Sequence, residues 1–272
     1  MRIPRSALMA GALATVLTFA GTAHAAAAPA PAFAPALAKN PLYKAGKLAL
    51  GTCDEPEVRS GTVDEVTTYL DTVLDCLNAA WEPKIKQAGF RFSRPKLQVI
   101  TRPGAPTGCG PYPLGAQALY CTLNNKITFL LSPNLVDEQS DLMFLVVIAH
   151  EYGHHVQQLT GMFKSLDTTF RGRSAAQRLD ASRRFELQAE CLSGAFIGDV
   201  WHSLGRRQTE LDHIVRNGGS GSDFAALGIK VDGPGDQTHG RASTIGRWLK
   251  RGFDAESAAG CNTWKAAKPQ VS

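Results

Sequence analysis

Residues 142–155 read LMFLVVIAHEYGHH, an apolar run that ends in a HExxH sequence. On an α-helix, positions four apart lie on the same face, so the imidazoles of His150 and His154 can bind one ion. Glu151 stands beside that pair, where a carboxylate can take a proton from a metal-bound water. The pattern predicts a helix that supplies two ligands and a general base to a hydrolytic zinc site.

The run before the motif is apolar all round, as expected of a helix buried inside a domain. We expect this helix over about residues 140–160, because Gly161 can end it. Tyr152, inside the motif, is expected to pack rather than to react. The alternative interpretation is a core helix that ends in surface histidines and binds no metal.

The N-terminus has the parts of a secretory signal peptide. Arg2 and Arg5 precede an apolar stretch over residues 7–20, which is too short to span a membrane as a mature helix. The sequence Ala-His-Ala at 23–25 then predicts cleavage after Ala25. No later stretch reaches spanning length, so we expect a secreted or cell-envelope protein without stable membrane insertion.

The rest of the chain divides by composition. Residues 26–50 begin as an Ala/Pro-rich stretch without a periodic apolar face, which predicts an extended linker. Residues 51–272 suit one compact catalytic domain. The whole chain carries a formal net charge of +5, and removing the two arginines of the signal leaves 5 − 2 = +3. This charge is too small to indicate nucleic-acid binding.

All six cysteines lie beyond the expected signal peptide. An even number in an exported protein favours disulfides, so a Cys191 nucleophile is the weaker alternative. Six cysteines allow fifteen pairings. Cys109 and Cys121 flank a Gly/Pro-rich loop, and Cys53 precedes the helix expected to carry Cys76. The expected pairs are therefore Cys53–Cys76, Cys109–Cys121 and, by elimination, Cys191–Cys261.

Periodicity predicts the scaffold around the motif. Apolar residues recur at intervals of three and four over 62–87, which predicts an amphipathic helix. Alternating residues predict three strands, at 96–101, 119–122 and 126–131. The pair Asn124-Asn125 suits a tight turn between the last two strands. With a further long helix over 174–202, the fold class is α+β, mainly helical with a small antiparallel or mixed sheet of about three strands.

A catalytic zinc ion generally takes three protein ligands and keeps a fourth position for water, so a third ligand must come from elsewhere in the chain. Glu186 and Glu190 lie four apart on the expected helix over 174–202. One of them can bind metal while the other accepts a hydrogen bond from a liganding imidazole. The alternative is a solvated acidic pair balanced by Arg183 and Arg184.

The residues that follow HExxH exclude one class of zinc site. The metzincin pattern needs Gly at 157 and His at 160, where this chain has Gln157 and Thr160. On a helix, His155 points about 100° away from His154, so we expect it to support the site or the packing. A zinc site without turnover would instead have a fourth protein ligand, with His155 or Glu190 as candidates. The intact motif speaks against the remaining alternative, an adhesion or peptidoglycan-binding module with a decayed site.

Five strings carry a resemblance to a known family: HEYGHHVQ at 150–157, ELQAEC at 186–191, Thr238-His239-Gly240, Arg247-Trp248 and Gly252-Phe253. Together they closely resemble the neutral zinc metallopeptidase family of bacteria, over about residues 60–265. The resemblance implies a zincin-like fold with a small sheet beside the HExxH helix, one Zn²⁺ ion, and a peptide or protein substrate. It also implies Glu186 as the third ligand, in the manner of gluzincins, and Glu190 as the carboxylate that orients an imidazole.

His239 is the remaining chemical candidate. A zinc peptidase gains from a donor aimed at the oxyanion that forms as water adds to the peptide carbonyl. An imidazole held by a nearby carboxylate could serve, and Asp236 is close in sequence. The alternative is that His239 caps a helix that starts near Thr238. We therefore expect His239 and Glu151 as catalytic residues, and His150, His154 and Glu186 as metal ligands.

Overall fold

A computed structural model of the chain describes residues 33–58, 62–113, 116–131, 141–222 and 238–272. The expected signal peptide lies outside the described residues. The helices are α1 (Pro35–Ala38), α2 (Val63–Gln87), α4 (Asp141–Leu159), α5 (Met162–Phe170), α6 (Ala175–Val200), α7 (Gln208–Asn217) and α10 (Ala242–Ala255). The strands are β1 (Lys96–Ile100), β2 (Ala118–Cys121) and β3 (Lys126–Leu130). The described residues also contain short 3₁₀ helices: η1 (Pro41–Lys44), η2 (Trp201–Ser203), η3 (Gly219–Ser222), η4 (Ala258–Cys261), η5 (Thr263–Lys265) and η6 (Lys268–Gln270).

The three strands form one mixed sheet in the order β1-β3-β2. β1 pairs with β3 in parallel, and β2 pairs with β3 antiparallel through the turn expected at the two asparagines. Asn125 has a φ of 51°, a left-handed conformation that asparagine tolerates better than most residues. The expected mainly helical α+β fold with a small sheet is confirmed, and β2 is left at one edge of that sheet.

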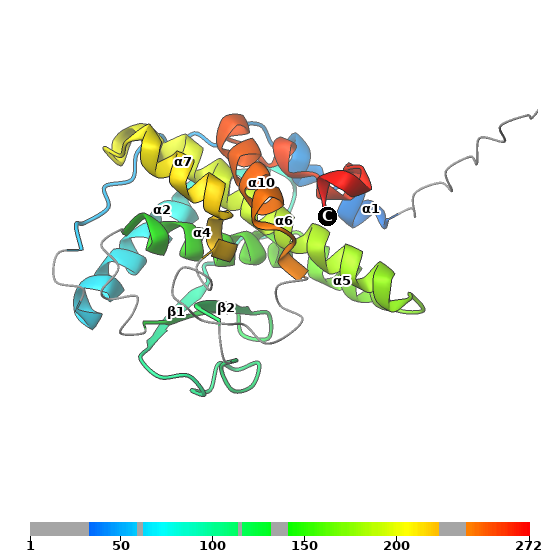
Figure 1. The fold of residues 1–272 in the computed structure, drawn as a ribbon, viewed down its shortest axis with the longest axis horizontal. Coiled ribbons are helices and arrows are strands. Elements are labelled where there is room, and N and C mark those ends of the chain that lie inside the picture. The colour runs from blue at the N-terminus through cyan, green and yellow to red at the C-terminus, as the bar shows by residue number, and fades with distance from the viewer. Residues whose placement is uncertain (1–32, 59–61, 114–115, 132–140, 223–237) are drawn as a thin grey trace, which may run out of the picture. The chain divides into compact units, whose positions relative to one another are not determined.

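Helix α4 lies at the centre of the described residues. It contacts α2 and α6 as well as strands β2 and β3 (Figure 1). Its apolar residues are buried all round, for example Leu145, Val146 and Ile148. Tyr152 is also fully buried and donates a hydrogen bond to Asn78 of α2, as expected of a packing residue. The HExxH sequence is therefore carried by a helix with little room to move.

Helix α6 packs closely against α4 and α10. It begins with a capping box in which Ser174 and Gln177 satisfy each other's backbone groups. A Cβ at Gly153 would lie 2.7 Å from the main-chain oxygen of Ala189, so only glycine lets α4 approach α6 at this point. Gly252 serves α10 in the same way, because a Cβ there would lie 1.8 Å from the main-chain oxygen of Cys191.

The six cysteines form three disulfides, and these are the three pairs expected from the sequence: Cys53–Cys76, Cys109–Cys121 and Cys191–Cys261. The first ties the segment before α2 to that helix. The last ties α6 to the C-terminal segment across 70 residues of chain. No cysteine is left as a free thiol for nucleophilic chemistry in the described residues.

The segment before residue 51 differs from the extended linker that the sequence predicted. From Phe33 onward the chain packs on the domain, and Leu37, Leu42 and Leu48 are buried in its core. Asn40 joins this segment to the end of α4 by a hydrogen bond to the main-chain oxygen of Thr160. Composition misled the prediction, because leucines spaced five and six apart among Ala and Pro show neither helical nor strand periodicity.

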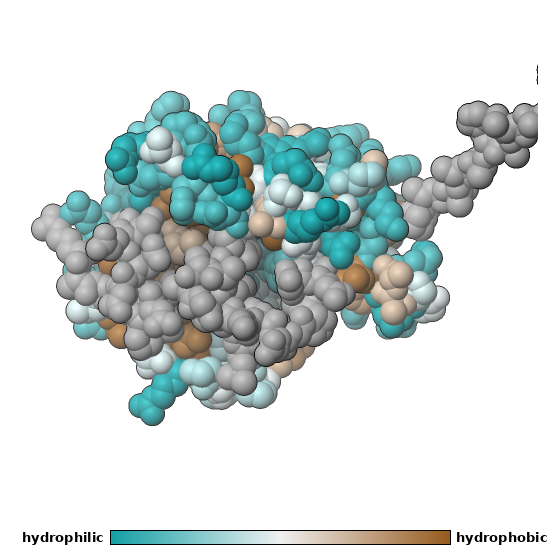
Figure 2. Space-filling model, viewed as in Figure 1, coloured by the Kyte–Doolittle hydropathy of each residue, from teal (hydrophilic) through white to brown (hydrophobic). Residues whose placement is uncertain are grey.

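In the part of the chain that the structure describes, no helix combines the length and apolarity needed to cross a membrane. Figure 2 shows hydrophilic residues over α7 and α10, and smaller hydrophobic patches elsewhere on the same face, including one near α5. Exposed large hydrophobic residues are few among the described residues, namely Val63 and Leu123.

Candidate metal centre

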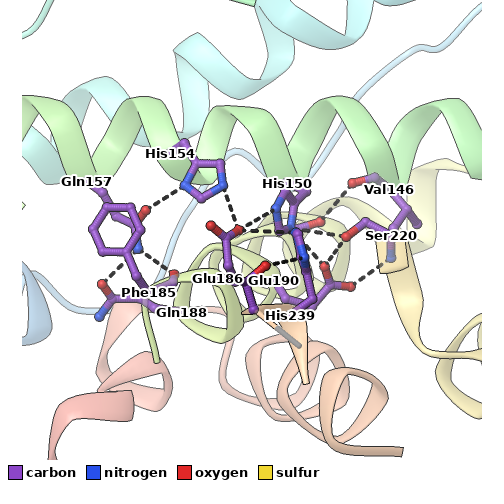
Figure 3. A network of polar contacts seen from close by, with 12 residues as sticks. Val146, His150, His154, Gln157, Phe185, Glu186, Gln188, Glu190, Ser220 and His239 are labelled. Atoms are coloured by element: carbon purple, nitrogen blue, oxygen red, sulfur yellow. Dashed lines mark hydrogen bonds and ion pairs between the residues drawn. The ribbon is translucent and has the colours of Figure 1, made fainter. Parts of the chain in front are cut away.

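The two motif histidines of α4 face a glutamate on α6 (Figure 3). Glu186 Oε2 lies 3.0 Å from His154 Nε2 and 3.5 Å from His150 Nε2. Both histidines are largely buried, and α4 and α6 can hold them there because the two helices touch at Gly153. The structure thus brings together the residues that sequence spacing placed in two separate helices.

The other ring nitrogen of His150 faces Glu190. His150 Nδ1 lies 2.9 Å from Glu190 Oε2, and Glu190 is only 1% exposed. Ser220 also holds this carboxylate, donating its main-chain N–H to Oε1 and its hydroxyl to Oε2, and its Oγ lies 3.1 Å from His150 Nδ1. Because a carboxylate only accepts, His150 donates through Nδ1 to Glu190, and this leaves Nε2 as the nitrogen that faces Glu186.

The outer nitrogen of His154 faces an amide in place of a carboxylate. His154 Nδ1 lies 2.8 Å from Gln157 Oε1. The orientation of Gln157 is determined by its other end, where Nε2 donates to the main-chain oxygen of Phe185 and to Gln188 Oε1. Gln188 in turn donates to Tyr43 in the N-terminal segment. His154 therefore donates through Nδ1, and its Nε2 is the nitrogen that faces Glu186.

His239 approaches the same carboxylate from the segment before α10. Its Nε2 lies 3.4 Å from Glu186 Oε2, and its side chain is 37% exposed. Ligand atoms of His150, Glu186 and His239 all lie within 4.8 Å of one another. The N-cap of α10 is Arg241, so His239 does not cap that helix. Asp236, its expected partner, lies outside the described residues.

The charges of this cluster favour a cation at its centre. Burial raises the pKa of Glu186, but the imidazoles of His154 and His239 and a hydrogen bond from His150 outweigh burial, so the net pKa lies well below its ordinary value. Burial lowers the pKa of His150, but Glu186 and Glu190 outweigh it and hold that pKa well above 6.5. An anionic oxygen beside two imidazole nitrogens, which would give up their protons to bind a cation, is the donor set that suits a zinc ion.

Glu151 and the cluster open onto a cavity of about 360 Å³. Glu151 is 9% exposed and lines this cavity together with His150, His154 and His239. Edge strand β2 forms one wall, and apolar side chains of α5 form another. A carboxylate beside a cation site in a cleft of this size is placed to exchange protons with a bound molecule.

His155, adjacent to the cluster in sequence, is turned away from it. Its Nε2 lies 2.7 Å from the main-chain oxygen of Ser93, and its Nδ1 lies 3.0 Å from the hydroxyl of Tyr120. Burial lowers the pKa of His155 to about 4, although the hydrogen bond to Ser93 opposes this shift. The side chain ties α4 to the sheet, which is the structural role expected from its direction on the helix.

Sequence reasoning missed three residues of the site: Gln157, Gln188 and Ser220. Gln157 excludes the metzincin pattern, and its place about one turn after His154 is the sequence signal that could have indicated a supporting role. Gln188 lies between the two glutamates of α6 without a motif of its own. Ser220 belongs to the Gly-Ser-Gly sequence at 219–221, which matches no motif that would indicate a site.

The fold and the cluster define a helical α+β protein in which a HExxH helix and a glutamate-bearing helix enclose a group of residues able to hold a metal ion. Comparison with known families agrees: the model of a family described as "Putative neutral zinc metallopeptidase" matches residues 51–264. The chain belongs to this family, as its motifs suggested.

Two bacterial relatives of the chain are described as uncharacterized proteins. The uncharacterized protein YpfJ of Escherichia coli strain K12 is 28% identical over 217 residues, which cover 74% of this chain and 72% of that protein. The uncharacterized protein Rv2575 of Mycobacterium tuberculosis strain H37Rv is 25% identical over 210 residues, 70% of this chain and 68% of that protein. No solved structure matches the chain.

Proposed function

We propose that the chain is an exported zinc-dependent metallopeptidase in which His150, His154 and Glu186 hold one Zn²⁺ ion. The observation that carries this proposal is the convergence of both inward Nε2 atoms on Glu186 Oε2, at 3.5 and 3.0 Å. Their outer Nδ1 atoms are each engaged by an acceptor from behind. Three protein ligands with oriented imidazoles are typical of catalytic zinc.

The reaction would be the hydrolysis of a peptide bond. A zinc ion held by these three residues would lower the pKa of a bound water towards about 7 and would polarise the carbonyl. Glu151 takes the proton from the attacking water and later delivers it to the leaving amine. His239, partly exposed at the cavity, donates a hydrogen bond to the oxyanion. Glu190 and Gln157 keep the two liganding imidazoles in the required tautomer.

A peptide suits the cavity because strand β2 forms one of its walls. In the described part of the sheet, β2 pairs with β3 on one side only. An unpaired strand edge can bind an extended chain by main-chain hydrogen bonds. The substrate would therefore lie along β2, with its scissile bond near Glu151.

Export agrees with the three disulfides, which persist in oxidising compartments. In this proposal residues 1–25 are a signal peptide cleaved after Ala25, and the mature protein acts outside the cytoplasm or in the cell envelope. N-terminal sequencing of the protein recovered from its native host tests the cleavage site.

The variant Glu151→Gln tests the function most directly. It keeps the shape of the side chain but removes the base, so peptide hydrolysis should fall to background while one zinc ion per chain stays bound. Asp254→Asn, an exposed change on α10, is the matched control and should keep full activity. Full activity of Glu151→Gln in a peptide-library assay would show that the assignment is wrong.

A second candidate is a zinc-binding protein without turnover, and the position of His239 favours it. His239 Nε2 is close enough to the cluster to serve as a fourth ligand, which would close the site. The variant His239→Ala separates the two candidates. As an oxyanion donor, His239 contributes to hydrolysis by about 10²-fold to 10³-fold with little effect on zinc affinity. As a ligand, its loss weakens zinc binding itself.

A further inference from the structure

Gln117 is buried beside the proposed metal centre, and its side-chain amide makes no hydrogen bond to the described residues of the free protein. Its side chain is 5% exposed and lines the same cavity as His150, Glu151 and His239. Neither Nε2 nor Oε1 has a hydrogen-bond partner among the residues that the structure describes. Burying an amide in this way is unfavourable, so such a group needs an explanation. A ligand in the cavity would supply both missing hydrogen bonds.

The backbone holds Gln117 at the start of the edge strand. Its main-chain oxygen accepts a hydrogen bond from Leu130 at 2.8 Å, which extends the β2–β3 ladder by one residue. Side chains alternate along a strand, so Gln117 and Leu119 project on the same side. A primary amide presents a donor and an acceptor side by side, as do the main-chain N–H and C=O of one residue in an extended chain, and the two can pair through two hydrogen bonds. Gln117 is therefore suited to bind the main-chain amide groups of an extended chain.

The cavity wall next to Gln117 is apolar. Phe163, Leu166 and Phe170 lie at intervals of three and four on α5 and share one face, which lines the cavity. Leu119 of β2 and Phe185 of α6 line it as well. Figure 2 shows a hydrophobic patch near α5. A wall of aromatic and aliphatic side chains favours a large apolar group of a bound molecule.

We propose that Gln117 binds a main-chain amide of the peptide substrate, and that the wall formed by Leu119, Leu166 and the three phenylalanines binds a large apolar side chain of the same peptide. This inference rests on the proposed function, because it names the substrate class of that site. It makes Gln117 a substrate-binding residue and predicts a preference for leucine, methionine or phenylalanine at one position beside the cleaved bond.

The variant Gln117→Met tests the amide. Methionine keeps the length of the side chain and removes both polar atoms. We expect kcat/KM for a cleaved peptide to fall about 10-fold to 100-fold. The unfolding temperature should stay the same or rise, because no hydrogen bond of the free protein is lost. The control Gln87→Met, at the exposed end of α2, should change neither quantity.

Two results would overturn the role of Gln117 while leaving the proposed function intact. One is a wild-type value of kcat/KM in Gln117→Met. The other is a fall in unfolding temperature of more than about 5 °C, since a 1 kcal/mol loss shifts a domain of this size by only about 2–4 °C. That result would mean that the folded protein itself uses the amide. Absence of any peptide cleavage by the wild-type, zinc-loaded protein would overturn both proposals.

A cleavage profile on a peptide library tests the apolar wall. The wild-type protein should select large apolar residues at one position, and Leu166→Ala should shift that selection towards larger side chains such as tryptophan. Thr168→Ala lies on the exposed face of the same helix and should leave the profile unchanged. Cleavage without preference for apolar residues, or an unchanged profile in Leu166→Ala, would contradict this part of the inference.

Discussion

Replacing Gln157 with leucine would test how the protein orients His154. Gln157 is fully buried and takes part in three hydrogen bonds: one from His154 Nδ1 at 2.8 Å, and two to Phe185 and Gln188 at 2.9 and 3.0 Å. Leucine fills a similar volume but offers no acceptor. The variant therefore removes the orientation of one proposed ligand without touching the ligand itself.

The magnitude follows from the groups left behind. The Nδ1–H of His154 becomes a buried donor without a partner, which costs about 1–3 kcal/mol, and the other two bonds contribute about 0.5–1.5 kcal/mol each. We expect the metal-free protein to lose about 2–6 kcal/mol of unfolding free energy. Loss of the group that supports a liganding histidine typically weakens metal binding about 10-fold to 100-fold. Zinc affinity should fall by that factor.

Two assays separate these effects. Zinc affinity is measured by competition with a chelator of known affinity, and stability by urea unfolding with excess chelator present. Gln158→Leu, at the next position of α4, is the matched control. In the described part of the chain the main-chain oxygen of Gln158 accepts a hydrogen bond from Gly161, and its side chain makes none. If Gln157→Leu bound zinc as tightly as the wild-type protein, the argument that Gln157 sets the tautomer of His154 would be refuted.

Three further predictions concern single residues. Glu186→Gln should weaken zinc binding by far more than Glu190→Gln, as measured by chelator competition. For Glu190→Gln we expect a loss of about 10-fold to 100-fold, because Glu190 contacts the outer nitrogen of His150 and not the proposed ion. The folded pKa of His155 is about 4, below 6.5 in the unfolded chain, so the folded state binds fewer protons between these values. Stability present above pH 6.5 is lost as the pH falls towards 4, by up to about 3 kcal/mol; urea unfolding should show a smaller loss in His155→Gln. Leu42→Ala should cost about 2–5 kcal/mol of unfolding free energy if the N-terminal segment belongs to the core.

Each of these has an outcome that contradicts it. Equal zinc affinities for Glu186→Gln and Glu190→Gln would remove the distinction between ligand and supporting carboxylate. A pH dependence identical to that of the wild-type protein in His155→Gln, measured with chelator in both cases, would assign the acid sensitivity to other groups. An unchanged unfolding free energy in Leu42→Ala would mean that the N-terminal segment is a linker, as its composition predicted, and not part of the core.

The sequence was informative where a function depends on local periodicity. HExxH places two histidines on one face within a single helix, and the helix and strand patterns near residues 62–87 and 126–131 are confirmed within one or two residues. Composition and periodicity failed where contacts between distant parts of the chain decide the structure. Ser220 contacts Glu190, 30 residues away, and Gln188 contacts Tyr43, 145 residues away. No local pattern records such pairs, and the burial of Leu42 depends on elements that follow it in the chain.

The two glutamates of α6 differ in their surroundings, although spacing alone does not distinguish them. Both lie on one face of the helix, and either could have been the ligand. Glu190 accepts hydrogen bonds from Ser220 at both oxygens and from His150 Nδ1 at one. Its carboxylate is therefore engaged at the outer nitrogen of the His150 imidazole. Glu186 faces the inner nitrogens of three histidines, and its pKa is held well below its ordinary value. A metal ion would replace the shared protons of that inner group, which is why this geometry supports Glu186 as the ligand.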